Sequence, residues 1–330
     1  MRITKRVHFY SNTMSFSNLR AVLALIFITT SLWAETAVVV TPASIGDLIR
    51  AQNPDLAAAR FRIQEALGRM KQSGRFANPE FETGLEHNSR FREGKFEIGL
   101  SQRFPVTDRL RLEKAVSATE LRASEAEVRE IERQLIGQAR EVAVKILANR
   151  QRRALLREQS TVSKEFAEFL SEIAAKGEGS PLDAGQAKLE ATSLSMEIRQ
   201  LDALETALLG ELKPLLGMHS GEALSVGGIL AQPTLPSSAV DPSRRPDFQV
   251  AKLGALAAAQ AVALEKSRRY DDIEGGFFTA AERKEDAPNG ASNDGIVGVR
   301  LKLTLPFWNK NEGAIQEAEA RKQKLHVPKW

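Results

Sequence analysis

Residues 121–142, LRASEAEVREIERQLIGQAREV, carry the pattern that decides the fold of this chain. Leu121, Val128, Leu135 and Val142 recur every seven residues, and charged or small residues fill most of the positions between them. An apolar residue at every seventh position predicts a helix that packs along its length against other helices.

The helical pattern extends far beyond this window. Residues 108–176 contain no proline, and Gly137 is their only glycine. At about 1.5 Å per residue, a helix of about 70 residues is roughly 105 Å long, more than a globular domain requires. Residues 177–181, GEGSP, end it, and their serine-proline pair is a typical start for the return helix that we predict over 182–216.

Apolar and polar residues alternate in four short segments, which indicates β-strands joined as two hairpins. We predict the strands at about 80–88, 95–103, 271–280 and 295–304. A polar loop over 283–294 is expected to connect the second pair. Phe104-Pro105 and Leu305-Pro306 end the returning strands, because proline cannot donate a hydrogen bond to a strand ladder.

The helix–hairpin–helix unit occurs twice. The NPDL motif that begins at Asn53 matches the RPDF motif that begins at Arg245, at an offset of 192 residues. We therefore expect a first repeat over 35–217, an irregular Gly-, Pro- and Ser-rich linker over 218–243, and a second repeat over 244–330. The second repeat is expected to be incomplete, because its long helix has barely begun when the sequence ends.

The first 34 residues are typical of a secretory signal peptide, with a basic start, an apolar run over 21–32 and a small residue, Ala34, for cleavage. The pattern leaves open whether the chain starts at Met1 or Met14. Without this segment the chain has 42 basic and 42 acidic residues, so its charge gives no reason to expect a nucleic-acid partner. No later segment is apolar enough for a membrane helix, so membrane insertion would require β-strands.

Three copies of a four-stranded unit would close a barrel of twelve strands. The apolar side chains expected to face lipid are Phe81, Leu85, Phe96, Ile98, Leu100, Phe277, Val297, Val299, Leu301 and Leu303. The charged side chains expected to face the lumen are Glu82, Glu97, Glu274, Arg300 and Lys302. The aromatics expected at a membrane interface are Phe104, Tyr270, Phe307 and Trp308. A soluble sheet with one buried face is the alternative interpretation.

Enzymatic and metal-binding chemistry has little support in the sequence. Cysteine is absent, and the four histidines are far apart, without metal-ligand spacing. There is no glycine-rich phosphate loop or nucleophile elbow, so we expect no cofactor and no catalytic site. Glu82 and Glu97 alternate along strands as carboxylates on a wet face do, which makes a glycosidase-like pair the weaker interpretation.

Four segments together resemble the TolC family of outer-membrane efflux proteins, in particular its heavy-metal resistance branch. They are AQNPDL at 51–56, NPEFE at 78–82, GLSQRFP at 99–105 and LPFWNKN at 305–311. The resemblance implies a mainly α fold with short β-hairpins, in which a homotrimer forms an outer-membrane β-barrel continued by a long periplasmic α-barrel. It also implies a passive exit duct that works with a periplasmic adaptor and an inner-membrane transporter.

The segment 176–183, KGEGSPLD, occupies the place of the family's helix-tip motif, where a glycine is followed six residues later by aspartate. The resemblance implies that this tip docks the adaptor. The candidate contact residues are Lys176, Gly177, Glu178, Ser180 and Asp183. The simpler interpretation is a helical turn in which Asp183 serves as a cap or first-turn charge.

Three other functions remain open. A periplasmic adaptor also combines a signal peptide with a long helical hairpin, although it would not duplicate the helix–strand–strand–helix unit. A structural periplasmic coiled coil would be a soluble elongated oligomer. A truncated, nonfunctional remnant of an efflux channel would share the ancestry without the activity.

Overall fold

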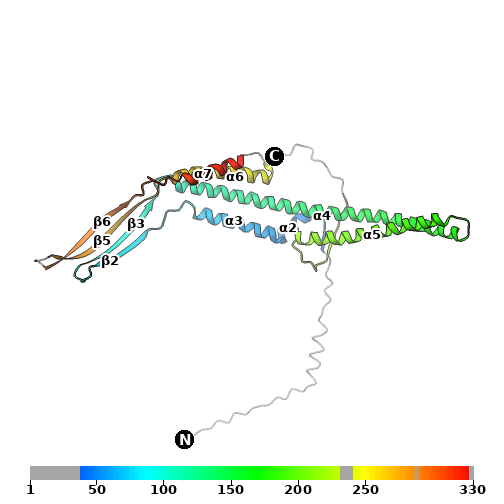
Figure 1. The fold of residues 1–330 in the computed structure, drawn as a ribbon, viewed down its shortest axis with the longest axis horizontal. Coiled ribbons are helices and arrows are strands. Elements are labelled where there is room, and N and C mark those ends of the chain that lie inside the picture. The colour runs from blue at the N-terminus through cyan, green and yellow to red at the C-terminus, as the bar shows by residue number, and fades with distance from the viewer. Residues whose placement is uncertain (1–37, 231–240, 287, 289, 327–330) are drawn as a thin grey trace, which may run out of the picture.

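The computed structural model describes residues 38–230, 241–286, 288 and 290–326. The molecule is elongated, with a β-sheet at one end, a helical hairpin at the other, and packed helices between them (Figure 1). The predicted signal peptide lies outside the described residues. In the part of the chain that the structure describes, no helix is long and apolar enough to cross a membrane.

One long helix, α4 (Arg109–Ala175, 67 residues), forms the spine of the molecule. Helix α5 (Pro181–Leu215) returns antiparallel along its distal half and forms the hairpin (Figure 1). Near the tip, the helices approach through small side chains of Ala167, Ala187 and Ala191. Small residues at these positions allow the two backbones to pack closely near the tip.

The other half of α4 packs against helices from both repeats. Helices α2 (Ile45–Gln52) and α3 (Pro54–Gln72) come from the first repeat, and α6 (Pro246–Ser267) comes from the second. Helix α7 (Glu312–His326) packs against α6. That the second repeat is incomplete stays a prediction.

Asn53 fixes the break between α2 and α3. Its side-chain oxygen accepts a hydrogen bond from the Leu56 N–H at 2.8 Å, which caps α3, and Pro54 occupies the first helical position. Its side-chain nitrogen donates to the Leu215 carbonyl at 2.8 Å, so the same residue ties α3 to the end of α5.

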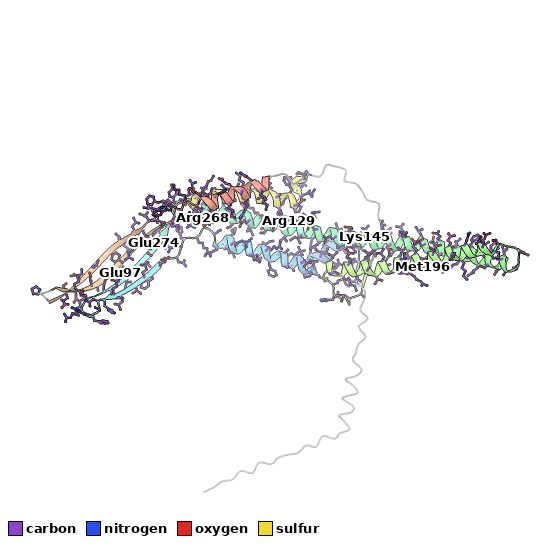
Figure 2. The ribbon with its side chains drawn as sticks, viewed as in Figure 1. Glu97, Arg129, Lys145, Met196, Arg268 and Glu274 are labelled. Atoms are coloured by element: carbon purple, nitrogen blue, oxygen red, sulfur yellow. The ribbon has the colours of Figure 1, made fainter. Side chains whose placement is uncertain are left out.

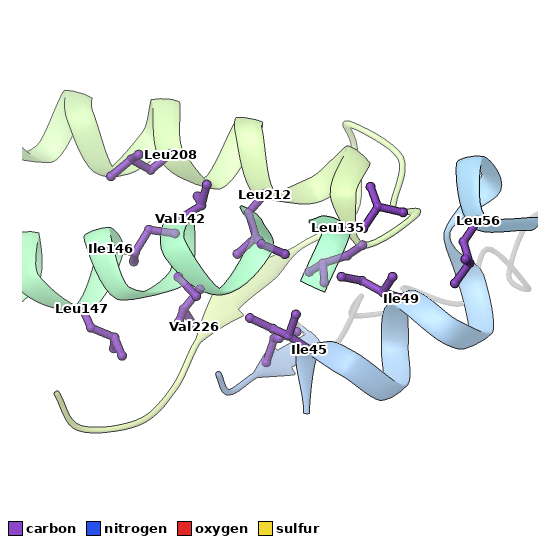
Figure 3. Close-up of a cluster of buried hydrophobic side chains, with 14 of the residues drawn as sticks. Ile45, Ile49, Leu56, Leu135, Val142, Ile146, Leu147, Leu208, Leu212 and Val226 are labelled. Carbon is purple, nitrogen blue, oxygen red and sulfur yellow. The ribbon is translucent and has the colours of Figure 1, made fainter. Parts of the chain in front are cut away.

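A core of large aliphatic side chains lies where these helices meet (Figure 3). Pairs spaced by four residues, such as Ile45 with Ile49 and Leu208 with Leu212, bring one face of each helix into it. We call this cluster the central core. It also holds Val226 of a short parallel ladder between β1 (Val38–Val40) and β4 (Leu224–Val226).

This ladder corrects the prediction that 218–243 is irregular throughout. The segment contains β4 and the 3-10 turn Pro242–Arg244, and residues 231–240 lie outside the described residues. Arg150 of α4 anchors β4 by donating to the Val226 carbonyl, and it also pairs with Glu205 of α5 at 2.6 Å. A three-residue strand pairing with a partner 186 residues away (224 − 38) leaves no periodic signal in the sequence.

The sheet is antiparallel, with strand order β2-β3-β5-β6. Its strands are β2 (Glu80–His87), β3 (Gly94–Phe104), β5 (Ile273–Asp286) and β6 (Gly290–Lys302). The prediction of a polar loop over 283–294 was wrong, because β5 and β6 continue their pairing to Asp286 and Gly290. Ladder hydrogen bonds use only the backbone, so polar side chains do not prevent the extension.

Candidate functional site

The sheet has two chemically different faces, because successive residues of a strand point to opposite sides. The register aligns the apolar residues of all four strands on one side, which we call the apolar face. Its large members are Phe81, Leu85, Phe96, Ile98, Leu100, Phe277, Val297, Val299 and Leu301. Each of these is exposed, up to 84% for Val297. Leu303, predicted with them, follows the end of β6 and is also exposed.

The opposite side, which we call the polar face, carries charged residues of both signs. It contains Glu80, Glu82, Glu86, Lys95, Glu97, Arg103, Glu274, Glu282, Lys284, Asp294, Arg300 and Lys302. The five residues predicted to line a lumen therefore share this face (Figure 2 labels Glu97 and Glu274). The sequence analysis missed Lys95 and Arg103, although alternation from Glu97 would have placed both on the same side.

Arg300 is the centre of an ion-pair network that crosses the polar face. Its guanidinium lies 2.6 Å from the Glu97 carboxylate on β3 and 3.1 Å from that of Glu82 on β2. Lys95 approaches the other oxygen of Glu97 at 2.6 Å. Gly276, which pairs with Arg300 across the ladder, has no side chain, so the guanidinium can reach over β5 beside the Phe278 ring.

One aromatic ring lies among these charges. The Arg300 guanidinium lies 5.1 Å from the centre of the Phe278 ring, and the Lys95 ammonium lies 6.0 Å from it. The ring covers Gly298, where a Cβ would come within 2.5 Å of it. The geometry is that of a cation–π contact, and the sequence analysis did not identify Phe278.

A second network joins the sheet to the helices. Arg109, at the start of α4, pairs with Asp272 at 2.6 Å and with Glu113 at 2.9 Å. Arg268, at the end of α6, pairs with Glu113 at 3.1 Å. A cavity of about 520 Å³ opens beside them and is lined by charged residues that include Glu274 and Lys302 of the polar face.

The charge state of Glu113 depends on this network. Partial burial by itself would raise the pKa of its carboxyl, but hydrogen bonds from Arg268 and Arg109 outweigh that effect and lower the pKa below its ordinary value. Glu113 therefore stays ionised at neutral pH and holds the ends of α4 and α6 together.

Four aromatic residues lie at the end of the sheet that is nearest the helices. Phe104 ends β3, and Phe307 and Trp308 follow β6, with their rings in an edge-to-face contact 6.2 Å apart. Tyr270 precedes β5. All four are exposed, Trp308 to 96%, which is unusual for large aromatic side chains.

The predicted tip motif forms the turn between α4 and α5. Gly177 has a φ of +78° and its N–H donates to the Ala174 carbonyl, the usual glycine end of a helix. The Ser180 hydroxyl accepts from the Asp183 N–H at 3.4 Å and caps α5. Two of the five tip residues therefore have structural roles, and Lys176, Glu178 and Asp183 expose their side chains.

The helical hairpin, the paired helices and the short four-stranded sheet make up the fold of outer-membrane channel proteins, as comparison with solved structures shows. VceC, an outer membrane protein of Vibrio cholerae, matches with a TM-score of 0.69 at 20% identity, over 86% of this chain and 73% of that chain. CusC matches with a TM-score of 0.67 at 15% identity, over 86% and 70%. The CmeC outer membrane channel of Campylobacter jejuni matches with a TM-score of 0.67 at 14% identity, over 87% and 66%.

Comparison of the sequence with family models and with curated proteins finds no match. The resemblance to the TolC family is confirmed at the level of the fold by these structures. At identities of 20% and below, the structural similarity establishes only the fold. The function of the chain must be argued from its own residues.

Proposed function

We propose that the chain is one protomer of an outer-membrane exit channel. Three copies would bring their sheets edge to edge into a closed barrel of twelve strands, with the apolar face toward lipid and the polar face toward the lumen. The helices would extend into the periplasm. This is a passive conduit, so no catalytic residue or cofactor is required.

The observation that carries this proposal is the exposure of the apolar face. In a water-soluble monomer, a contiguous patch of nine large apolar side chains would be an aggregation hazard. A lipid environment removes the cost of exposing that patch. The charged network of the polar face would be expensive in lipid and stable in a water-filled channel, so only one orientation of the sheet satisfies both faces.

The soluble-sheet interpretation requires something else to cover the apolar face. In the part of the chain that the structure describes, no helix packs on this sheet. A soluble coiled coil would leave these side chains in water, and an adaptor would not need a sheet with one apolar and one charged face. We therefore favour the channel over both of these alternative functions.

The absence of cysteine offers a direct test. Single cysteines would be placed along β6, at Val297, Val299 and Leu301 on the apolar face and at Arg300 and Lys302 on the polar face. In intact outer membranes, a water-soluble maleimide is expected to label the polar-face positions and to spare the apolar-face positions. Equal labelling of both sets, or recovery of the chain in the soluble periplasmic fraction, would contradict the proposal.

The wider assembly is a further part of the proposal. The tip residues Lys176, Glu178 and Asp183 would contact a periplasmic adaptor, and an inner-membrane transporter would supply the cargo. The resemblance to the heavy-metal branch makes divalent heavy-metal cations the cargo to test first. Cells with and without the gene would be compared for growth in cobalt, zinc or cadmium salts and, as a control, in organic dyes; protection against dyes alone would contradict this cargo.

A further inference from the structure

The end of the sheet farthest from the helices contains a hollow that residues of both faces line. Its charged lining residues, besides Arg283, are Glu86, Arg92, Glu93, Lys95, Glu282 and Asp294. Its volume is about 480 Å³. Two rows of residues that pair across the four strands contribute to its lining. The rows are Leu85, Phe96, Ala281, Gly295 and, one step farther out, His87, Gly94, Arg283, Asn293.

The hollow exists because small residues lie between larger ones. Gly94, Ala281 and Gly295 leave the surface low, and a Cβ added at Gly295 would meet no atom within 4 Å. Phe91 and His87 form a wall at one side, with their rings stacked 4.1 Å apart. Leu85 and Phe96 therefore give the hollow an apolar base, and the stacked rings of Phe91 and His87 lie along one edge of it.

Arg283 supplies a positive charge above this base. It is exposed, and it makes no ion pair with any other residue that the structure describes. Its neighbours differ: Lys284, on the polar face, pairs with Glu282 at 2.9 Å, and Arg92 pairs with Glu285 at 3.0 Å. The guanidinium of Arg283 is therefore available to an anion from outside the chain.

The distance between the hollow and the exposed aromatic residues matches the height of the apolar band of an outer-membrane barrel. Strand β3 has 11 residues, from Phe104 among the exposed aromatics to Gly94 in the hollow. Ten steps of about 3.3 Å give roughly 33 Å along the strand, and a tilt of about 40° reduces this to roughly 25 Å. That is about the height of the apolar band of outer-membrane barrels, so both ends of the strand would lie at headgroup level.

We propose that this hollow binds the phosphate-bearing headgroup of an anionic glycolipid in the outer leaflet, of the lipid A type. Arg283 would hold the phosphate, because a planar guanidinium can donate two parallel hydrogen bonds to it. An acyl chain would lie along Leu85 and Phe96, and the Phe91–His87 pair would cover the edge of the headgroup. The inference rests on the membrane orientation proposed above.

The test uses the full chain, processed by its host, in phosphatidylcholine nanodiscs with increasing lipid A. Native mass spectrometry would count the lipid A molecules retained and give an apparent Kd. The variant Arg283→Gln is expected to weaken binding roughly tenfold, the usual loss for one charge-assisted contact. Lys284→Gln removes a positive charge from the adjacent residue on the other face and is expected to leave the Kd unchanged.

A second variant tests the hollow without changing its charge. Gly295→Val places a side chain in open space within the hollow, at a position where a β-branched residue suits the strand. It is expected to reduce lipid A binding as strongly as Arg283→Gln does. Inorganic pyrophosphate, which offers phosphates without acyl chains, is expected to displace lipid A only at far higher concentration.

The outcomes separate this inference from the channel proposal. If the wild-type chain does not enter phosphatidylcholine nanodiscs, the membrane orientation fails. If it enters them but Arg283→Gln and Lys284→Gln bind lipid A like the wild type, the channel proposal stands and the lipid site is overturned. Pyrophosphate binding as tight as that of lipid A would overturn the role of the acyl chain.

Discussion

The central core and the sheet contain the same kinds of large apolar side chain in opposite environments. Leu212 and Ile146 of the core are fully buried, whereas Val297 and Val299 of the sheet are 84% and 76% exposed. In the core, helices from the first repeat and the linker meet and exclude water. The sheet has no such partner among the described residues, so its apolar residues indicate an environment that the chain does not itself provide.

The largest effect is expected from removing a side chain of the central core. Leu212→Ala should lower the free energy of unfolding by about 2–5 kcal/mol, because it loses buried surface and leaves a cavity. The matched control is Leu189→Ala on the same helix, where the side chain is 72% exposed. Denaturant unfolding of the full chain in detergent, followed by circular dichroism, would compare the two.

Equal losses in the two leucine variants would contradict the location of the core. The comparison is informative because both substitutions remove the same atoms and change helix propensity equally on α5. Any difference between them therefore reports packing alone.

The second prediction tests the sheet by placing a charge on each face in turn. Val297→Arg should reduce insertion into the outer membrane, since an arginine at the lipid midplane costs about 2–4 kcal/mol. Ile296→Arg, one residue earlier on the polar face, should be tolerated because the proposed orientation turns that face toward the water-filled lumen. The measurement is the fraction of each variant recovered as a folded, membrane-extracted oligomer.

If Ile296→Arg were excluded from the membrane and Val297→Arg were not, the assignment of the two faces would be reversed. If neither variant affected insertion, the apolar face would not contact lipid, and its exposure would need another explanation, such as a protein partner.

The third prediction concerns the ion-pair network around Glu113, where the start of α4 and the end of α6 meet the sheet. The folded-state pKa of Glu113 is lowered, so its contribution to stability is present above its unfolded pKa of about 4.3 and is lost as pH falls through the folded value. At neutral pH, Glu113→Gln should cost about 1 kcal/mol, because Arg109 and Arg268 lose their shared carboxylate. Below that window, the variant and the wild type should converge.

Unfolding curves at several pH values would give this difference directly. Glu120→Gln, on the same helix, removes an exposed carboxylate and should change little at any pH. A difference between Glu113→Gln and the wild type that stays unchanged down to the lowest pH at which the protein is folded would show that packing, and not ionisation, is responsible.

Periodicity allowed much of this fold to be predicted from the sequence. The heptads of α4 and the alternation of Phe96, Ile98 and Leu100 repeat a local rule over many residues, so the helix and the composition of each face were accessible. The β1–β4 ladder and the network around Glu113 were not, because they join segments distant in sequence through only a few residues each. The strand extension past Arg283 was missed because its residues are polar enough to suggest a loop.

The smallest effect on stability is expected at the helical tip. The exposed side chains there belong neither to the central core nor to the apolar face of the sheet. Glu178→Gln should change the free energy of unfolding by less than about 0.5 kcal/mol, as surface substitutions usually do. Gly177→Ala should cost about 1 kcal/mol, since it forces a side chain into a positive φ. If the tip docks an adaptor through its side chains, Glu178→Gln will weaken cross-linking to that adaptor in cells that carry the pump, although it leaves the fold intact. If only Gly177→Ala weakens it, the tip acts through the shape of its turn, and Glu178 is an ordinary solvated residue.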